Sequence, residues 1–290
     1  MAKSFKAYLY LLPALLIISV FILYPMLKSF LMAFYTDYDY FKDEVKAYGV
    51  DNFVYLWNDS EFHLALKNTF IFVLGVVPAS IIISLLIAVL LNSKINLKGL
   101  FRTIYFIPFV TSVVAVSIVW RWIFHSDYGL LNYFLGFISI EPIEWLESAK
   151  YSMPALIILS IWKGLGYNII ILLAGLQNIN DAYYRAARID GANVWHRFIH
   201  ITLPGLAPTL FFISIISVIN GFKVFDEIYA LFGGKPGIAN SSLTVVYYVF
   251  NKFYGEWEFG VASAAAYVLF IIIFIFTLIQ LYIGKKKITY

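Results

Sequence analysis

The chain has 290 residues, of which 62% are hydrophobic and 13% charged, with a formal net charge of +4 and a mean hydropathy of +0.82. Soluble domains carry about 25% charged residues, so the composition excludes an ordinary globular protein and indicates one that lies largely within a membrane. Because the chain has no cysteine, disulfides, thiolate metal sites and cysteine nucleophiles are excluded as well.

Six segments are long and apolar enough to cross a bilayer, which takes about 20 mostly apolar residues. The first is too long for a signal peptide and has no small-residue cleavage site. We therefore expect an all-α polytopic membrane protein with six transmembrane helices. In chain order, the predicted spans are 8–34, 68–91, 104–124, 153–176, 206–225 and 263–283.

Charged residues between the spans indicate an orientation. If the N-terminus is cytoplasmic, the segments on that side hold 11 Lys and Arg against 2 Asp and Glu, and those on the other side hold 6 against 15. Basic residues of short loops stay on the cytoplasmic side, so both termini are expected there. We expect a peripheral helix with an outer loop (1–66), a core of five helices (67–284) and a basic cytoplasmic tail (285–290).

The segment 177–204 is too polar to span the membrane and too regular for a plain loop. Residues 182–189 and 193–201 each predict a short helix, and Gly191 between them permits the positive φ of a tight break. Apolar residues recur at three- and four-residue spacing in the second helix, which predicts an amphipathic helix. Two interpretations stay open: a helix pair that docks into a groove of another protein, and an amphipathic helix that lies on the lipid surface.

No motif of the sequence predicts catalysis. The nearest approach to a nucleotide-binding GxxxxGK[ST] loop is Gly234-Lys235, which Pro236 follows, so the chain is not expected to hydrolyse ATP. His196 and His200 lie four residues apart, but no third ligand is nearby in the sequence. We therefore expect a solvated helix face there and no metal site.

The same segment resembles the cytoplasmic loop of the type-1 permeases of binding-protein-dependent ABC importers, which reads EAAxxDGAxxxxxFxxIxLP. Nine of its ten fixed positions match, and the departure is Arg185 in place of the glutamate. Further stretches, such as 100–110, 120–132, 162–179, 222–237 and 258–270, resemble the sugar-permease branch of that family. The ten positions in this chain are Arg185, Ala186, Ala187, Asp190, Gly191, Ala192, Phe198, Ile201, Leu203 and Pro204.

The resemblance implies a type-1 permease that forms half of a sugar translocation pathway in the plasma or inner membrane. It implies that 181–204 docks into an ATPase and that this chain has no cofactor, with ATP and Mg²⁺ held by the ATPase. The implied partners are a second homologous permease, two ATPase subunits, an extracytoplasmic solute-binding protein, the sugar and the lipid bilayer. No nucleic acid is expected.

Ionisable residues inside spans are candidates for function because they are costly there. Two clusters combine such residues with the hydrogen-bonding and aromatic groups that sugars need: Lys163 with Tyr167, and Lys223 and Asp226 beside Asn220 and Phe222. The resemblance also implicates Gly164, Tyr167, Asn220 and Gly221. The alternative for Lys163 is a structural ion pair with Asp226, and Lys223 would then extend toward the membrane surface.

Two other classes of protein are alternatives. An ion-coupled secondary transporter often shows inverted repeats and broken helices at the midplane, but the two halves of this chain show no convincing repeat. A polytopic membrane enzyme needs converging Asp, Glu or His, whereas the acidic residues here scatter through the predicted outer loops. The identity of the sugar is not encoded in any of these residues.

Overall fold

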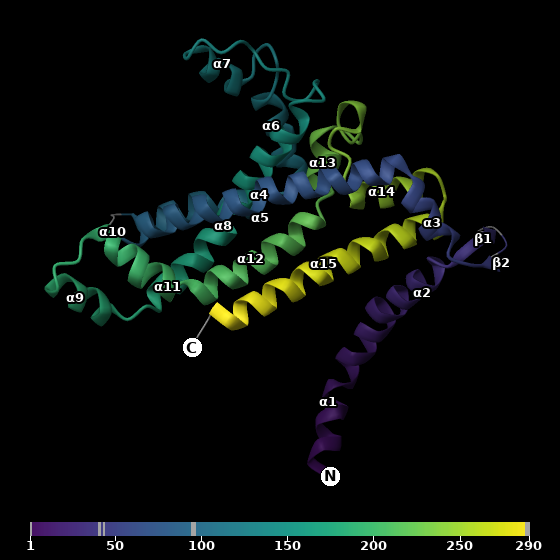
Figure 1. Cartoon of the computed structure of the whole chain (residues 1–290), viewed down its shortest axis with the longest axis horizontal. Helices are drawn as coiled ribbons and strands as arrows, with labels where there is room; N and C mark the ends of the chain where they lie inside the picture. Colours follow the sequence, from purple (N-terminus) through teal and green to yellow (C-terminus); the bar gives the residue numbers. More distant parts are fainter. Residues whose placement is uncertain (1, 40–41, 43, 94–96, 288–290) are drawn as a thin grey trace. The chain divides into compact units, whose positions relative to one another are not determined.

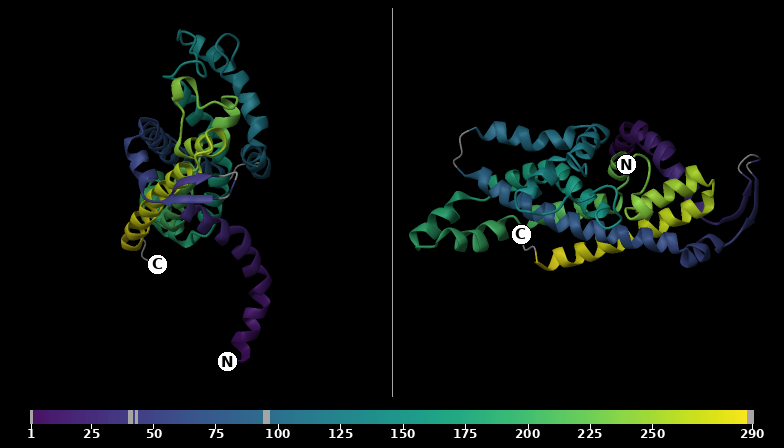
Figure 2. Two further views of the ribbon diagram at one scale, coloured as in Figure 1. Left: turned by 90° about the vertical axis from the view of Figure 1, so that its right-hand side faces the viewer. Right: turned by 90° about the horizontal axis from the view of Figure 1, so that it is seen from above.

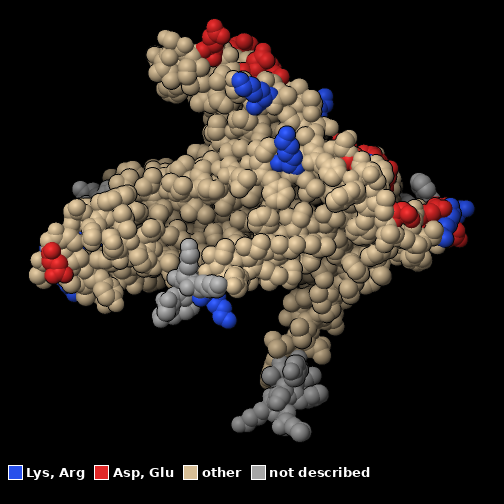
Figure 3. Space-filling view, viewed as in Figure 1, with Lys and Arg blue, Asp and Glu red and all other residues tan. Residues whose placement is uncertain are grey.

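The computed structural model describes residues 2–39, 42, 44–93 and 97–287, and most of this part of the chain is helical (Figure 1). It forms two compact units. The first unit comprises Met1–His63 and Tyr248–Ile271, and the second comprises Leu64–Tyr247 and Ile272–Tyr290. Charged side chains gather in small groups separated by wide uncharged surfaces (Figure 3), as expected of helices that face hydrocarbon.

Four helices of the described chain are long and apolar enough to span a membrane, or six if two bent helix pairs each count as one span. The four are Tyr10–Met32, Ser60–Asn92, Ser152–Gln177 and Phe259–Lys285. No residue in the apolar window of Tyr10–Met32 is buried inside the structure. The bent pairs are Lys98–Val110 with Val113–Ile123, and Val194–Gly205 with Ala207–Phe222.

The third predicted span, 104–124, is not one straight helix. Helices α5 (Lys98–Val110) and α6 (Val113–Ile123) meet at 100°. Pro108 lies near the end of α5 and cannot donate a backbone hydrogen bond, and Thr111 then adopts an extended conformation with φ −76° and ψ 144°. The apolar run continues through the break, which is why composition alone predicts one span.

The first unit contains the sheet of the described chain, an antiparallel hairpin. Asn52 fixes the hairpin because its amide donates to the carbonyls of Ala33 and Tyr35, each at 3.0 Å. The elements of this unit are α1 (Ala2–Ile18), η1 (Ser19–Leu23), α2 (Tyr24–Met32), β1 (Tyr35–Asp39), β2 (Glu44–Tyr48), α3 (Asp51–Asn58) and η4 (Asn251–Gly255).

Lys252 is the centre of a polar network in the first unit. Its ammonium group donates to Tyr55 Oη at 3.2 Å and forms ion pairs with Glu256 and Glu258 at 2.6 and 3.0 Å. Burial acts to lower the pKa of Lys252, but these hydrogen bonds outweigh it and raise the pKa above the ordinary lysine value. The buried lysine is therefore charged and fully paired.

Three helices run through parts of both units: α4 (Ser60–Asn92), α14 (Val245–Phe250) and α15 (Phe259–Lys287). The remaining elements belong to the second unit. They are α5, α6, α7 (Leu130–Gly136), α8 (Ser152–Gln177), α9 (Asp181–Ile189), α10 (Val194–Arg197), η2 (Phe198–Thr202), α11 (Leu203–Gly205), α12 (Ala207–Phe222), α13 (Asp226–Leu231) and η3 (Ile238–Asn240).

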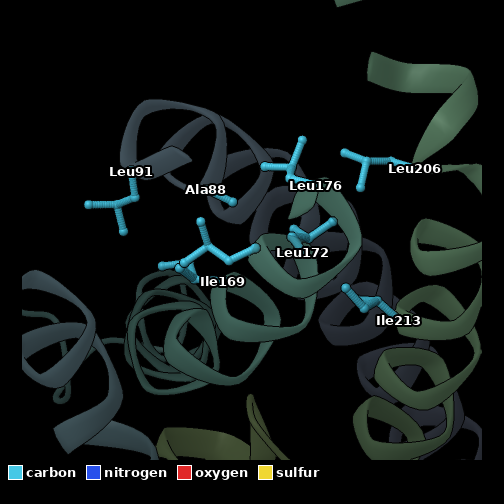
Figure 4. Close-up of a cluster of buried hydrophobic side chains, with 8 residues drawn as sticks. Ala88, Leu91, Ile169, Leu172, Leu176, Leu206 and Ile213 are labelled. Atoms are coloured by element: carbon cyan, nitrogen blue, oxygen red, sulfur yellow. The ribbon is translucent and has the colours of Figure 1, made fainter. Parts of the chain in front are cut away.

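The apolar core of the second unit lies where α4, α8 and α12 meet. Figure 4 shows its side chains pointing toward one another from these helices. Glycines let the neighbouring backbones approach: a Cβ on Gly166 would lie 2.2 Å from the carbonyl oxygen of Tyr105 in α5, and one on Gly175 would lie 2.6 Å from Thr209 Oγ1 in α12. Small residues at crossings are the usual way for membrane helices to pack. The core consists of Ala88, Leu91, Ile169, Leu172, Leu173, Leu176, Leu206 and Ile213.

Residues 126–145, called the α7 lobe below, are organised around one buried side-chain amide. Asn132 is 7% exposed, and its amide nitrogen donates to the carbonyls of Ser126 and Ile143, each at 2.9 Å. Its amide oxygen accepts from the indole of Trp145 at 2.9 Å. This single side chain therefore ties both ends of the lobe together.

Candidate functional site

A cavity of about 210 Å³ lies within the second unit, between α4, α5, α8, α12 and α13. Its wall alternates aromatic rings with polar side chains, which is the chemistry that binds polyhydroxylated ligands. The lining residues are Phe72, Val76, Ser80, Phe109, Ser160, Gly164, Tyr167, Asn168, Ile216, Ser217, Asn220, Gly221, Lys223, Val224, Phe225, Asp226 and Glu227.

The structure brings together six of the eight predicted substrate-binding residues. From α8 come Gly164 and Tyr167, whose ring stacks on Phe109 with centroids 5.2 Å apart and planes 27° apart. The end of α12, the turn after it and the start of α13 supply the other four. These are Asn220, Gly221, Lys223 and Asp226.

Two predicted residues lie outside the lining. Lys163 forms an ion pair with Glu227 of α13, with Nζ 3.3 Å from Oε1 and the two side chains 17% and 20% exposed. The alternative pairing with Asp226 is therefore wrong: the partner is the next residue along the chain. Phe222 is 1% exposed and packs edge-on against Phe70 at 5.4 Å.

The structure adds polar residues that the sequence did not single out. Ser160 and Asn168 lie four residues before and after Gly164 on α8, so all three share the face that lines the cavity. Asn168 is only 4% exposed, and the buried hydroxyl of Ser160 has no hydrogen-bond partner among the described residues. A four-residue spacing from Gly164 was the signal available in the sequence.

The segment 181–204 forms the helix pair that its sequence predicts. The side chain of Asn180 caps α9 by accepting from the amide of Ala182 at 2.9 Å, and Asn193 caps α10 by accepting from His196 at 2.7 Å. Between the helices, Gly191 has φ +78°. The hydroxyl groups of Tyr184 and Thr202 lie 2.9 Å apart and join α9 to η2.

This helix pair extends from one end of the second unit, beyond α8 and α12 (Figure 1, Figure 2). Ile189, Val194 and Trp195 are 86%, 74% and 67% exposed, although all three are large and apolar. Phe198 is half-buried under Trp195, with ring centroids 5.6 Å apart. Among the predicted coupling residues, Arg185, Ala186, Asp190, Gly191, Leu203 and Pro204 are exposed, while Ala187, Ala192 and Phe198 are half-buried.

The described residues contain no group of three or more His, Asp or Glu side chains that could hold a metal ion. His196 and His200 stack on each other with centroids 4.0 Å apart, and Nδ1 of His200 lies 3.0 Å from the carbonyl oxygen of His196. One ring nitrogen is therefore occupied by the backbone. The cavity and the exposed helix pair are therefore the two candidate sites that the sequence and the structure share.

Comparison with known proteins identifies the family of the chain. Residues 77–288 match the family described as "Binding-protein-dependent transport system inner membrane component". The chain is 39% identical to a lactose transport system permease protein of Rhizobium radiobacter over 97% of this chain and 95% of that one. It is 32% identical to a trehalose/maltose transport system permease protein of Thermococcus litoralis over 97% and 94% of the two chains.

Solved structures show the same fold. A chain of a bacterial ABC transporter involved in the import of the acidic polysaccharide alginate superposes with a TM-score of 0.85 at 24% identity, covering 98% of this chain and 96% of that one. The family match favours an importer subunit over an ion-coupled transporter. The chain therefore belongs to the family of inner membrane components of binding-protein-dependent transport systems.

Proposed function

We propose that this chain is the permease subunit of an ATP-driven importer for a sugar or oligosaccharide. The observation that carries the proposal is the cavity. It brings the Tyr167 and Phe109 rings together with Asn168, Asn220 and the Ser160 hydroxyl, which has no hydrogen-bond partner among the described residues. Sugar binding needs both an apolar face and several hydrogen-bonding groups. Near-full-length relatives that are named for lactose, arabino-oligosaccharides and trehalose or maltose support the same substrate class.

The proposed motor is a pair of ATPase subunits that bind ATP and Mg²⁺ and dock at α9 and α10. The exposed Ile189, Val194 and Trp195 supply the apolar contact, and Arg185 supplies a charge at its edge. Burying such side chains in a partner is favourable by about 25 cal/mol per Å² of apolar surface. This docking places the helix pair and both termini in the cytoplasm, in agreement with the distribution of Lys and Arg.

Two further partners complete the proposed complex. A second, homologous permease forms the other half of the pathway, and an extracytoplasmic solute-binding protein delivers the sugar. A similar alginate transporter has been solved with its saccharide-bound periplasmic protein. In the proposed mechanism, movement of the ATPases is transmitted through α9 and α10 and alternately opens the cavity to the two sides of a plasma or inner membrane.

Substitution at Gly191 tests the coupling role in the assembled complex. Gly191→Glu places a charged side chain on a backbone with φ +78°. We expect uptake of radiolabelled lactose, maltose or arabino-oligosaccharide to fall at least tenfold while membrane insertion is unchanged. Gly191→Asn is the matched control, since asparagine tolerates positive φ. If ATPase subunits still co-purify and uptake persists in Gly191→Glu, the proposed coupling role is wrong.

The energy source is tested separately. ATP depletion at constant membrane potential should stop uptake, while a protonophore at constant ATP should not. The reverse result would refute an ATP-driven importer.

A further inference from the structure

Helix α13 has one end in each of two cavities of the second unit. Asp226 and Glu227 at its start line the candidate sugar cavity, whereas Leu231 at its end lines a second cavity of about 280 Å³. The second cavity is bordered by α6, by the 144–147 loop and by the loop that follows α13. A six-residue helix is only about 9 Å long, so the two cavities come close to each other at α13.

Both connections of α13 are suited to a hinge. Before it, Lys223 and Phe225 leave the helical region, with φ/ψ of −98°/13° and −148°/−55°. After it, Gly233 and Gly234 have φ of +66° and +81°, a conformation that glycine adopts without strain. Residues at the ends of helices, as here, can take up the changes in φ and ψ that accompany a rigid-body movement of the helix.

Two cationic side chains from neighbouring helices hold α13. Arg121 of α6 donates through Nε to the carbonyl of Leu231 at 2.8 Å and through Nη2 to that of Ala230 at 2.5 Å. These carbonyls end the helix and have no partner within it. Lys163 of α8 holds the other end through its 3.3 Å ion pair with Glu227.

The two attachments of α13 differ in how easily a ligand can compete with them. Arg121 makes two hydrogen bonds to backbone carbonyls of α13, whereas the Lys163–Glu227 ion pair is a single contact between two side chains. Glu227 lines the candidate sugar cavity and Lys163 does not. A ligand hydroxyl that reaches this carboxylate therefore shares it with the ammonium group and weakens the attachment.

We propose that α13 is a movable partition between the two cavities, that Lys163 and Glu227 form its releasable latch, and that Arg121 is the positioning residue that keeps its other end in register. The proposal rests on the proposed function, because it assigns the second cavity to the entry route of the same substrate. Occupation of the sugar cavity then favours release of the partition, and closure of the latch separates the cavities again.

Cross-linking in the assembled complex tests the movement. The chain has no cysteine, so Lys163→Cys with Glu227→Cys places the only two thiols of this subunit at the latch. With a short bifunctional methanethiosulfonate, we expect uptake of the radiolabelled saccharide panel to fall at least tenfold and a reductant to restore it. The reagent should leave the uptake of each single-cysteine variant at the level measured for that variant before treatment, and it should not change the uptake of the unsubstituted complex.

A cross-linked double variant with full uptake would overturn the proposal. Failure of the unsubstituted complex to take up any saccharide with ATP would instead refute the proposed function. If the double-cysteine variant does not assemble, the latch is tested by exchanging its two charges in the double variant Lys163→Glu with Glu227→Lys. We expect each single reversal to raise ATPase activity without substrate at least threefold and the exchange to return it to within a factor of two. An exchange no better than the single reversals would also overturn the latch.

Discussion

The crossing of α5 and α8 at Gly166 predicts a large effect of a single methyl group. A Cβ at this position would lie 2.2 Å from the carbonyl oxygen of Tyr105 and 2.9 Å from the Cα of Phe106. Both atoms belong to the backbone, so no side-chain rotation can relieve the overlap. To reach an ordinary contact, the two helices must separate by about 1 Å, and overpacking of this kind costs about 1–3 kcal/mol.

The effect should appear in both stability and transport. For Gly166→Ala we expect the midpoint of thermal unfolding of the purified complex to fall by about 2–12 °C, using about 2–4 °C per kcal/mol for a chain of this size. Because Tyr167 follows directly and stacks on Phe109 of α5, separation of the helices also disturbs the cavity. We therefore expect the apparent KM for uptake to rise.

The matched control is Gly99→Ala in α5, the helix that Gly166 of α8 contacts. A Cβ there meets no atom within 4 Å, and alanine favours a helix over glycine by about 0.5–1 kcal/mol. This variant should be as stable as the unsubstituted chain or slightly more stable. If Gly166→Ala has the unfolding midpoint of Gly99→Ala, the close approach of α5 and α8 does not exist in the protein.

Three further predictions concern the cavity, the polar network and the α7 lobe. Tyr167→Ala and Asn220→Ala should each raise the apparent KM for saccharide uptake about tenfold, and unchanged kinetics would remove both from the site. Lys252→Met should lower the free energy of unfolding by about 1–2 kcal/mol. Because the pKa of Lys252 is raised in the folded state, its contribution to stability is complete below the ordinary lysine pKa of about 10.4 and is lost only above it. The difference in the free energy of unfolding between Lys252→Met and the unsubstituted chain should therefore be constant from pH 6 to 9. A difference that disappears in this range would contradict the network. Asn132→Ala should make residues 126–145 sensitive to limited proteolysis, and an unchanged digestion pattern would show that other contacts hold the lobe.

The sequence predicts the helical segments well because long apolar runs and capping residues act locally. The helix pair after α8 follows from Gly191 and the spacing of its apolar residues, and Gly191 has the expected positive φ in the structure. The asparagine caps of the two helices were not singled out in the sequence. The bend at Thr111 is different. The apolar run continues through the bend, and hydropathy contains no information about the angle between the two helices.

The site shows a similar division. The sequence identifies Tyr167 and Asn220 because aromatic and amide groups inside apolar spans are conspicuous. It does not distinguish Asp226 from Glu227 as the partner of Lys163, since one residue along a helix turns a side chain by about 100°, and only the packing of α13 against α8 sets that angle. The role of Arg121 depends on the end of a helix 110 residues later in the sequence, which no local pattern can indicate.

The first hydrophobic helix has a consequence for biogenesis. None of the apolar window in Tyr10–Met32 is buried by the rest of the described chain, so the helix gains its stability from the lipid or the neighbours that surround it. Membrane helices insert as separate units before they associate. This helix can therefore insert before the remainder of the chain associates with it.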